Sequence, residues 1–332
     1  MNKKIYLPIL LMLLHVHLCT AQLKGTLVVV NKADNAVSLI NLESGKTKAI
    51  IPVEYGPHEA AVSPSGKLAA ISNYGDQTVT GSSISIINIS TQTKTKTIQL
   101  GEYTRPHGIE FINEEELIAT CESKKVLLRI HISKETVEEI TGTAQSGSHM
   151  VAYSKTDNKA YITNVLSGTV SVIDIANRSL TKVILMKPGV EGIDISPDGK
   201  ELWVANRNDS SVTVINTASF ETIAVLKAHQ LPFRVKFSPD NTFVAVSNAA
   251  TGNISMFDVK TKVIKSDVDT RLQKDSPPFP VGIASHSQSE FFFACLAGYD
   301  MAAAISTKTF KVIKTYATGK SPDGIYYSSV II

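Results

Sequence analysis

The run Tyr161-Ile162-Thr163-Asn164 decides the fold, because similar runs recur along the whole chain. Each run is short and apolar and closes on asparagine or cysteine, and the seven runs end at Asn31, Asn73, Cys121, Asn164, Asn206, Asn248 and Cys295. Successive ends are 42, 48, 43, 42, 42 and 47 residues apart. A repeat of roughly 40–50 residues is typical of four-stranded propeller blades. The spacing therefore predicts seven blades.

Each repeat carries four strand-like segments separated by turns. In the fifth repeat, Ser211-Val212-Thr213-Val214-Ile215 alternates polar and apolar residues, as a half-buried strand does. Ser196-Pro197-Asp198-Gly199-Lys200 reads as a tight turn, because proline presets φ and glycine tolerates a positive φ. No window of ten or more residues has a helical period. We therefore expect an all-β, seven-bladed β-propeller that occupies residues 22–332 as a single domain.

The two ends of the chain fall in the same repeat. The first strand-like segment, at Leu27, is the second strand of a unit, and the last, Gly324 to Ser328, is the first strand of a unit. We predict that these two segments pair and complete one blade. Such pairing removes the exposed sheet edges that an open array would keep.

Three motifs carry a resemblance to a known family: Tyr161 to Asn164, Ser171-Val172-Ile173-Asp174, and the turn Ser196 to Lys200. They resemble the YVTN-repeat seven-bladed propellers of exported bacterial proteins, which are related to lactonase-type propellers. The resemblance spans about Leu23 to Ser329. It implies the propeller fold but no single function, since this family and its relatives include surface proteins, a DNA-binding periplasmic propeller and lactonases.

Residues 1–21 have the pattern of a cleaved secretory signal. Lys3 and Lys4 precede an apolar core from Ile5 to Leu18, and Cys19-Thr20-Ala21 supplies small residues before Gln22. This predicts a periplasmic or secreted protein. The alternative is a lipoprotein acylated at Cys19. No other stretch approaches the ~18 apolar residues that a membrane span needs.

Charge and cysteine content exclude several classes of function. The formal net charge is +3, and removal of Lys3 and Lys4 with the leader lowers it to +1, so charge gives no indication of nucleic-acid binding. Only Cys121 and Cys295 remain after the leader, which leaves no disulfide framework and no Cys-x-x-Cys motif for haem or zinc. No phosphate loop or dinucleotide fingerprint occurs. We therefore expect neither haem nor a nucleotide as cofactor.

The first strands of five consecutive blades begin with polar residues at equivalent positions, and this column reads Asp323, His58, His107, His149 and Glu191. In a propeller these positions line one mouth of the central channel. Histidine and carboxylate bind divalent metals such as zinc, copper, nickel or iron, and neutral imidazole suits acid–base catalysis. We predict a ligand or metal site here, with His58, His107 and His149 as metal ligands. The same three histidines and Glu191 are the catalytic candidates. The alternative is polar side chains that only hydrate the channel mouth.

Further residues are expected at the same mouth, and the candidates for ligand binding are Glu59, Asn73, Tyr74, Glu122, Asn206, Arg207, Arg234 and Asp323. Arginine binds carboxylate or phosphate in bidentate fashion, unless a channel acid pairs with it first. The asparagines have an alternative role as caps of the turn to the next strand.

Three functions remain open at this stage. The favoured one is the binding of a small polar ligand or a divalent metal, since no catalytic motif of known spacing is present. The second is a lactonase-like hydrolase, in which a metal or a histidine activates water and Arg207 or Arg234 holds a substrate carboxylate. The third is a scaffold for a protein partner.

Overall fold

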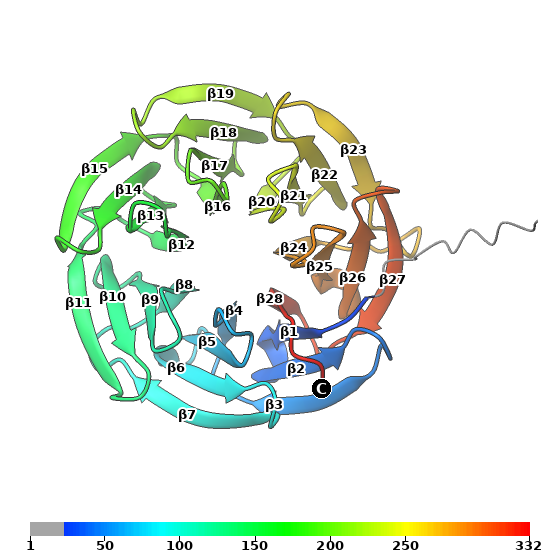
Figure 1. Cartoon of the computed structure of the whole chain (residues 1–332), viewed down its shortest axis with the longest axis horizontal. Helices are drawn as coiled ribbons and strands as arrows, with labels where there is room; N and C mark the ends of the chain where they lie inside the picture. The colour runs from blue at the N-terminus through cyan, green and yellow to red at the C-terminus, as the bar shows by residue number, and fades with distance from the viewer. Residues whose placement is uncertain (1–22) are drawn as a thin grey trace, which may run out of the picture.

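A computed structural model describes residues 23–332; the predicted leader, including Cys19, lies outside the described residues and stays a prediction. Within them, 28 strands form seven four-stranded antiparallel sheets arranged as a ring (Figure 1). The prediction of an all-β, seven-bladed propeller is confirmed. The helical segments of this part of the chain are two 3-10 turns, η1 (Lys32–Asp34) and η2 (Ala297–Tyr299), and none of its helices is long and apolar enough to cross a membrane.

Each blade runs from an innermost strand at the channel to an outermost strand at the rim. From inside to outside, the blades are blade 1, β28 (Pro322–Ser328), β1 (Thr26–Asn31), β2 (Ala36–Asn41) and β3 (Thr47–Pro52); blade 2, β4 (Pro57–Val62), β5 (Leu68–Gly75), β6 (Thr80–Asn88) and β7 (Thr93–Gln99); blade 3, β8 (Pro106–Phe111), β9 (Glu116–Cys121), β10 (Val126–His131) and β11 (Thr136–Gly142); blade 4, β12 (Ser148–Ser154), β13 (Lys159–Asn164), β14 (Thr169–Asp174) and β15 (Ser179–Leu185); blade 5, β16 (Val190–Ile195), β17 (Glu201–Asn206), β18 (Ser211–Asn216) and β19 (Thr222–Lys227); blade 6, β20 (Pro232–Phe237), β21 (Phe243–Asn248), β22 (Asn253–Asp258) and β23 (Ile264–Asp269); and blade 7, β24 (Pro280–Ser285), β25 (Phe291–Leu296), β26 (Met301–Ser306) and β27 (Lys311–Ala317).

The ring is closed by the two ends of the chain, as predicted. Strand β28 lies beside β1 and pairs with it antiparallel (Figure 1). In this pairing Thr26 is opposite Ser328 and Val29 is opposite Ile325. Beyond the strand, the Thr26 hydroxyl donates a 2.6 Å hydrogen bond to the carbonyl of Val330. Blade 1 is therefore built from both ends of the described chain.

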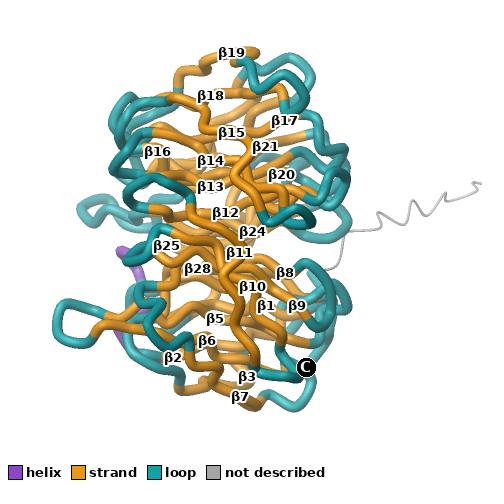
Figure 2. Tube along the Cα trace, turned by 90° about the vertical axis from the view of Figure 1, so that its left-hand side faces the viewer, coloured by secondary structure: helices purple, strands orange, loops and turns teal. Residues whose placement is uncertain are grey.

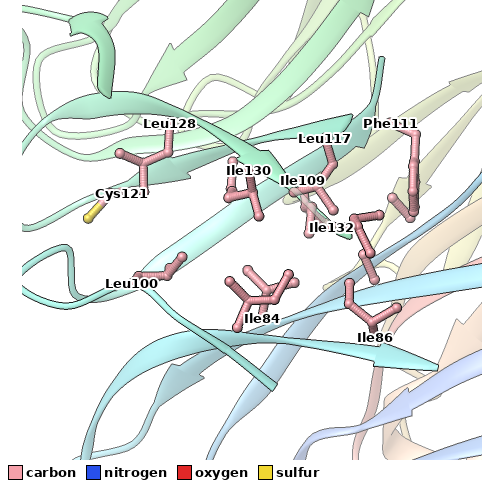
Figure 3. Close-up of a cluster of buried hydrophobic side chains, with 14 of the residues drawn as sticks. Ile84, Ile86, Leu100, Ile109, Phe111, Leu117, Cys121, Leu128, Ile130 and Ile132 are labelled. Atoms are coloured by element: carbon pink, nitrogen blue, oxygen red, sulfur yellow. The ribbon is translucent and has the colours of Figure 1, made fainter. Parts of the chain in front are cut away.

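The core lies between neighbouring blades, whose apolar faces pack on each other. Figure 3 shows the cluster between blades 2 and 3, where Ile84 and Ile86 of β6 pack with Ile109, Leu128 and neighbouring residues of blade 3. The middle strands are buried on both faces, and the outermost strands expose alternate residues to solvent. Side-by-side packing of this kind needs apolar residues on both faces of a strand, which explains the continuous apolar runs in the sequence.

Every innermost strand carries a bulge at its second and third residues. In β8, Pro106 pairs with Cys121 and Ile109 with Ala119, so that two residues of β8 oppose one of β9. The other six blades have the same irregularity. A bulge re-aims the side chain that it contains. In blades 1 to 5 the first bulged residue is the residue of the polar column, so the bulge turns that column toward the channel mouth, whereas blades 6 and 7 have Phe233 and Val281 at this position.

Glycine at the second bulged position lets neighbouring inner strands approach closely. A Cβ on Gly282 would lie 2.1 Å from the carbonyl oxygen of Asp323, and one on Gly324 would lie 2.6 Å from that of His58. Gly108 and Gly192 make equally close approaches to the next blade. Two of the three blades without this glycine place Glu59 and Arg234 there, and both side chains enter the channel.

Candidate functional site

The site lies on the face where the inner strands begin and the second strands end, here termed the site face. The 3-10 turns η1 and η2 directly follow β1 and β25, which are second strands of their blades. Both turns therefore lie on the site face, which is on the left-hand side of Figure 2. The three histidines of the polar column converge on it. The ring centroids of His58 and His107 are 5.2 Å apart, and those of His107 and His149 are 3.6 Å apart. Tyr74 completes the cluster, with its ring 4.5 Å from that of His58.

His149 is held between two carboxylates. Its Nδ1 lies 2.6 Å from Glu122 Oε1 and its Nε2 lies 2.8 Å from Glu191 Oε1. Burial lowers the pKa of His149, but the charges and hydrogen bonds of Glu191 and Glu122 outweigh burial and raise it to about 9. Both ring nitrogens therefore carry protons at neutral pH. The Tyr74 hydroxyl donates to the second oxygen of Glu122 at 2.6 Å, which fixes that carboxylate.

Glu191 is the centre of a buried ionic network. Burial raises its pKa, but His149, Arg234 and Arg207 outweigh burial and hold it at about 2. Arg207 donates to Oε2 at 2.7 Å, and Arg234 donates to Oε1 at 3.2 Å. Arg234 also bonds to Glu59 of the opposite side of the ring. Its guanidinium thus crosses the channel between β20 and β4.

His58 and His107, unlike His149, are neutral at neutral pH. Burial lowers the pKa of His58 to about 4 and that of His107 well below its ordinary value. Nδ1 of His58 lies 2.8 Å from the Gly56 carbonyl. A carbonyl only accepts, so Nδ1 carries the proton and Nε2 keeps its lone pair. His107 is 3% exposed, and its Nδ1 has no hydrogen-bond partner among the described residues.

A cavity of about 520 Å³ opens beside His58 and Tyr74. Its size is within the roughly 300–1,000 Å³ range of small-molecule sites. Lys32 of η1 and Arg105, the residue before β8, also line it, and the Arg105 guanidinium lies 5.0 Å from the Tyr74 ring centroid. The blade 2 insertion between β5 and β6 contributes Gln77 to the wall. Sequence reasoning missed Lys32 and Arg105, since the conformation of a loop decides whether its cations face the cavity.

Most residues of the predicted site belong to this cluster. Asp323 lies near His58, where its charge opposes the effect of burial on the histidine pKa, and the Lys32 ammonium lies 3.5 Å from it. Arg207 and Arg234 are at the site, but Glu191 and Glu59 already pair with them. Each of the two arginines thus already has a carboxylate partner within the protein, and their role in holding a substrate carboxylate stays a prediction.

The Asn73 and Asn206 side chains, predicted as ligand-binding or as turn caps, bind elsewhere and are not among the residues that line the cavity beside His58. The Asn73 amide donates to Ser83 and Ser85, and the Asn206 amide donates to Ser211 and Thr213. Both amides thus bind hydroxyls of the third strand in their own blade. The sequence held a signal for this role: Asn31, Asn164, Asn206 and Asn248 each have a serine or threonine seven residues later, to which their amide donates.

The metal-ligand prediction for His58, His107 and His149 finds no support in the geometry. Within residues 23–332, no group of three or more histidine, cysteine, aspartate or glutamate side chains is arranged to hold a metal ion. Metal binding needs a deprotonated nitrogen, and both nitrogens of His149 donate to carboxylates. Cys121 and Cys295 are free and buried.

The ring of seven four-stranded blades with a polar cluster at one mouth defines a seven-bladed β-propeller. A family model described as "Lactonase, 7-bladed beta-propeller" matches residues 17–275, and the chain belongs to this family. The match supports the predicted relation to lactonase-type propellers. The YVTN-repeat resemblance itself stays a prediction.

Two curated proteins are similar in sequence. One is a 6-phosphogluconolactonase of Serratia proteamaculans, 22% identical over 183 residues, which is 48% of this chain and 55% of the relative. The other is Antigen Lp49 of Leptospira interrogans, 24% identical over 140 residues, which is 38% of this chain and 30% of the relative. The chain thus matches about half and about a third of the length of these relatives.

Solved structures share the fold at low identity. A chain of the hydrazine synthase of Kuenenia stuttgartiensis aligns with a TM-score of 0.73 at 18% identity, covering 89% of this chain and 99% of that one. A functionally unknown protein of Desulfotomaculum acetoxidans aligns with a TM-score of 0.76 at 15% identity, covering 92% and 99%. Identities this low show the fold alone.

Proposed function

We propose that the chain is a lactonase-like hydrolase that opens a small anionic lactone in the 520 Å³ cavity of the site face. The observation that carries the proposal is the state of His58. Its Nδ1 is fixed as a donor to Gly56, and a pKa of about 4 leaves Nε2 unprotonated at neutral pH. Membership of the lactonase propeller family and the likeness to a 6-phosphogluconolactonase support the reaction class.

In the proposed reaction, Nε2 of His58 takes a proton from water as the water oxygen bonds to the lactone carbonyl carbon. The resulting oxyanion collapses, the ring C–O bond breaks, and the proton on His58 passes to the departing alkoxide. The product is a hydroxy acid, so atoms and charge balance. Lys32 and Arg105 supply positive charge for the anionic group of the substrate and for the oxyanion.

An anionic substrate also improves His58 as a base. An acceptor with a pKa of about 4 is always available at neutral pH but is weakly basic. A bound anion beside it favours the protonated form and raises its pKa toward neutrality. The acid limb of kcat/KM, which reports the free enzyme, should therefore lie near pH 4, and the acid limb of kcat should lie at a higher pH.

The test is turnover of a panel of sugar-acid lactones with and without a phosphate group, measured by acid release. We expect His58→Gln to lower kcat/KM by about 10²–10⁴-fold, the usual contribution of a general base. His131→Gln, which changes a histidine of β10 in the middle of blade 3, is the control and should keep full activity. Turnover that survives in His58→Gln would rule out this role for His58.

A second candidate is binding of the same class of anion without turnover. It is favoured by the pairing of Arg207 and Arg234 with Glu191, which leaves Lys32 and Arg105 as the cations that line the cavity. Calorimetry with gluconate and 6-phosphogluconate as probes separates the two candidates. Binding that Arg105→Gln weakens, with no lactone hydrolysed by the wild type, would establish this second function.

A further inference from the structure

A second group of charged side chains lies at the other end of the channel. Three residues beyond the polar column, the inner strands present Glu110, Asp194, Lys236 and Tyr326 in blades 3, 5, 6 and 1. The remaining three blades have alanine at this position, namely Ala61, Ala152 and Ala284. Four blades thus have a charged or phenolic side chain where the other three have an alanine that packs in the core between blades.

These side chains line a cavity of about 350 Å³. Turns between inner and second strands, such as Ser196-Pro197, form its rim. The site-face cavity has none of these lining residues, and the Arg234 guanidinium crosses the channel between the two ends. The cavity at this end therefore shares no lining residue with the site-face cavity.

Lys236 and Asp194 form an ion pair. The Lys236 ammonium lies 3.4 Å from Asp194 Oδ1, and Asp194 Oδ2 accepts the backbone N–H of Phe237 at 2.8 Å. The ammonium also lies 5.9 Å from the centroid of the Tyr326 ring. Asp194 thus has both carboxylate oxygens engaged, and its charge offsets that of Lys236.

Glu110 is left without such a partner. No described residue donates a hydrogen bond to its carboxylate. The ionisable groups around it, from all the strands that face it or line a cavity with it, are Glu59, Tyr153, Lys155, Asp194, Arg234, Lys236 and Tyr326. Burial raises its pKa to about 7, because the Lys236 charge offsets burial only in part. A nearby cation or a proton stabilises a partly buried carboxylate of this kind.

We propose that this cavity binds a small organic ammonium ion, whose charged group pairs with Glu110 and whose apolar part packs on the aromatic side chains of the wall. With such a ligand bound, the carboxylates of Glu110 and Asp194 are balanced by two ammonium groups, that of Lys236 and that of the ligand. Phe111, Tyr153 and Tyr326 supply the aromatic surface, and cations are attracted to aromatic rings. An alkaline-earth ion instead prefers a shell of about six oxygen ligands, several of them carboxylates, whereas Glu110 is the one carboxylate of this wall to which no described residue donates.

Proton linkage gives the proposal a quantitative signature. The ammonium pairs with ionised Glu110, and the ionised fraction of a group of pKa about 7 falls about tenfold between pH 8 and pH 6. The affinity for the ammonium should therefore fall about tenfold over the same range. Close to one proton should be released per ligand bound at pH 6.

The test is titration calorimetry of the whole chain with n-butylammonium, at pH 8 and pH 6 and in two buffers of different ionisation enthalpy. n-Butanol is the neutral probe of similar shape. Glu110→Gln should weaken butylammonium binding at least tenfold at pH 8 and abolish its pH dependence. Glu115→Gln, which neutralises an exposed carboxylate in the turn after β8, is the matched control and should bind as the wild type.

Each contrary outcome overturns the proposal. Equal affinity for butanol, undiminished binding in Glu110→Gln, or absence of binding at tens of millimolar would each exclude an ammonium site. Competition by potassium at equal concentration would replace the organic ligand by an alkali ion. A circular-dichroism melt of Glu110→Gln shows whether the variant folds. The proposal does not depend on the lactonase reaction, and lactone turnover by Glu110→Gln should be unchanged.

Discussion

The stability of the propeller should depend on the charge of His149, and the size of the effect follows from its two ion pairs. His149 bridges Glu122 and Glu191 at 2.6 and 2.8 Å, and its pKa is about 9 in place of the ordinary 6.5. That difference corresponds to about 3 kcal/mol in favour of the folded state. The low pKa of Glu191 expresses the same interaction from the other partner, so it is not added to this figure.

The sign follows from the direction of the change. A group whose pKa is raised by folding stabilises the folded protein fully below its unfolded pKa and loses this contribution as the pH rises through its folded pKa. For His149 the stabilisation is complete below about pH 6.5 and disappears as the pH rises through about 9. His149→Gln removes the titrating charge while leaving a donor in place. The gap in unfolding free energy between wild type and variant should be about 3 kcal/mol at pH 6 and should shrink toward zero by pH 10.

Urea unfolding at a series of pH values measures this gap, with the fluorescence of Trp203, the single tryptophan, as the signal. His131→Gln is the control, and its gap to the wild type should be small and independent of pH. A gap between wild type and His149→Gln that stays constant from pH 6 to pH 10 would refute the assignment of a charged His149 between two carboxylates.

Three further outcomes can be measured by the same unfolding assay. Arg234→Met should cost about 3–5 kcal/mol, because it leaves Glu59 buried without its cation and removes one of the three cations that pair with Glu191; a neutral effect would show that water reaches these carboxylates. Gly282→Ala should lower the melting temperature by several degrees, since its Cβ would meet backbone at 2.1 Å, whereas Gly142→Ala, with 3.8 Å to its nearest neighbour, should be close to neutral. Deletion of residues 321–332 should abolish cooperative unfolding or cause aggregation, and a truncated protein that melts like the full chain would contradict the closure of blade 1.

The fold could be predicted from the sequence because the spacing of the recurring apolar runs gives the length of one blade. The seven runs fixed the number of blades, and the phase of the first and last strands fixed the closure. The observed β28 starts at Pro322, two residues before the predicted Gly324. Such differences at strand ends arise because hydrogen bonding and bulges, which the pattern of apolar residues does not encode, decide where pairing begins.

The candidate site could be predicted only for residues whose position in the repeat determines where the side chain points. His58, His107 and His149 converge as expected, since each blade has the same bulge. The Asn73 and Asn206 side chains point toward hydroxyl groups of the neighbouring third strand. An asparagine at the end of the second strand has the same place in the sequence pattern whether it caps the turn or binds such a hydroxyl. The protonation of His149, against neutral His58, could not be predicted either, because it depends on which carboxylates the rings reach.

The pairing of β28 with β1 also sets the order in which the molecule can be made. The Thr26 hydroxyl bonds to a carbonyl 304 residues further along the chain, so blade 1 is unfinished until nearly all of the described chain has been synthesised. Until then the inner edge of β1 has no partner strand, and an unpaired edge is prone to join other chains. Contacts between such distant residues form slowly. A chain that terminates early keeps this open edge, whatever the quality of its other six blades, and only chains that contain β28 can reach the closed state.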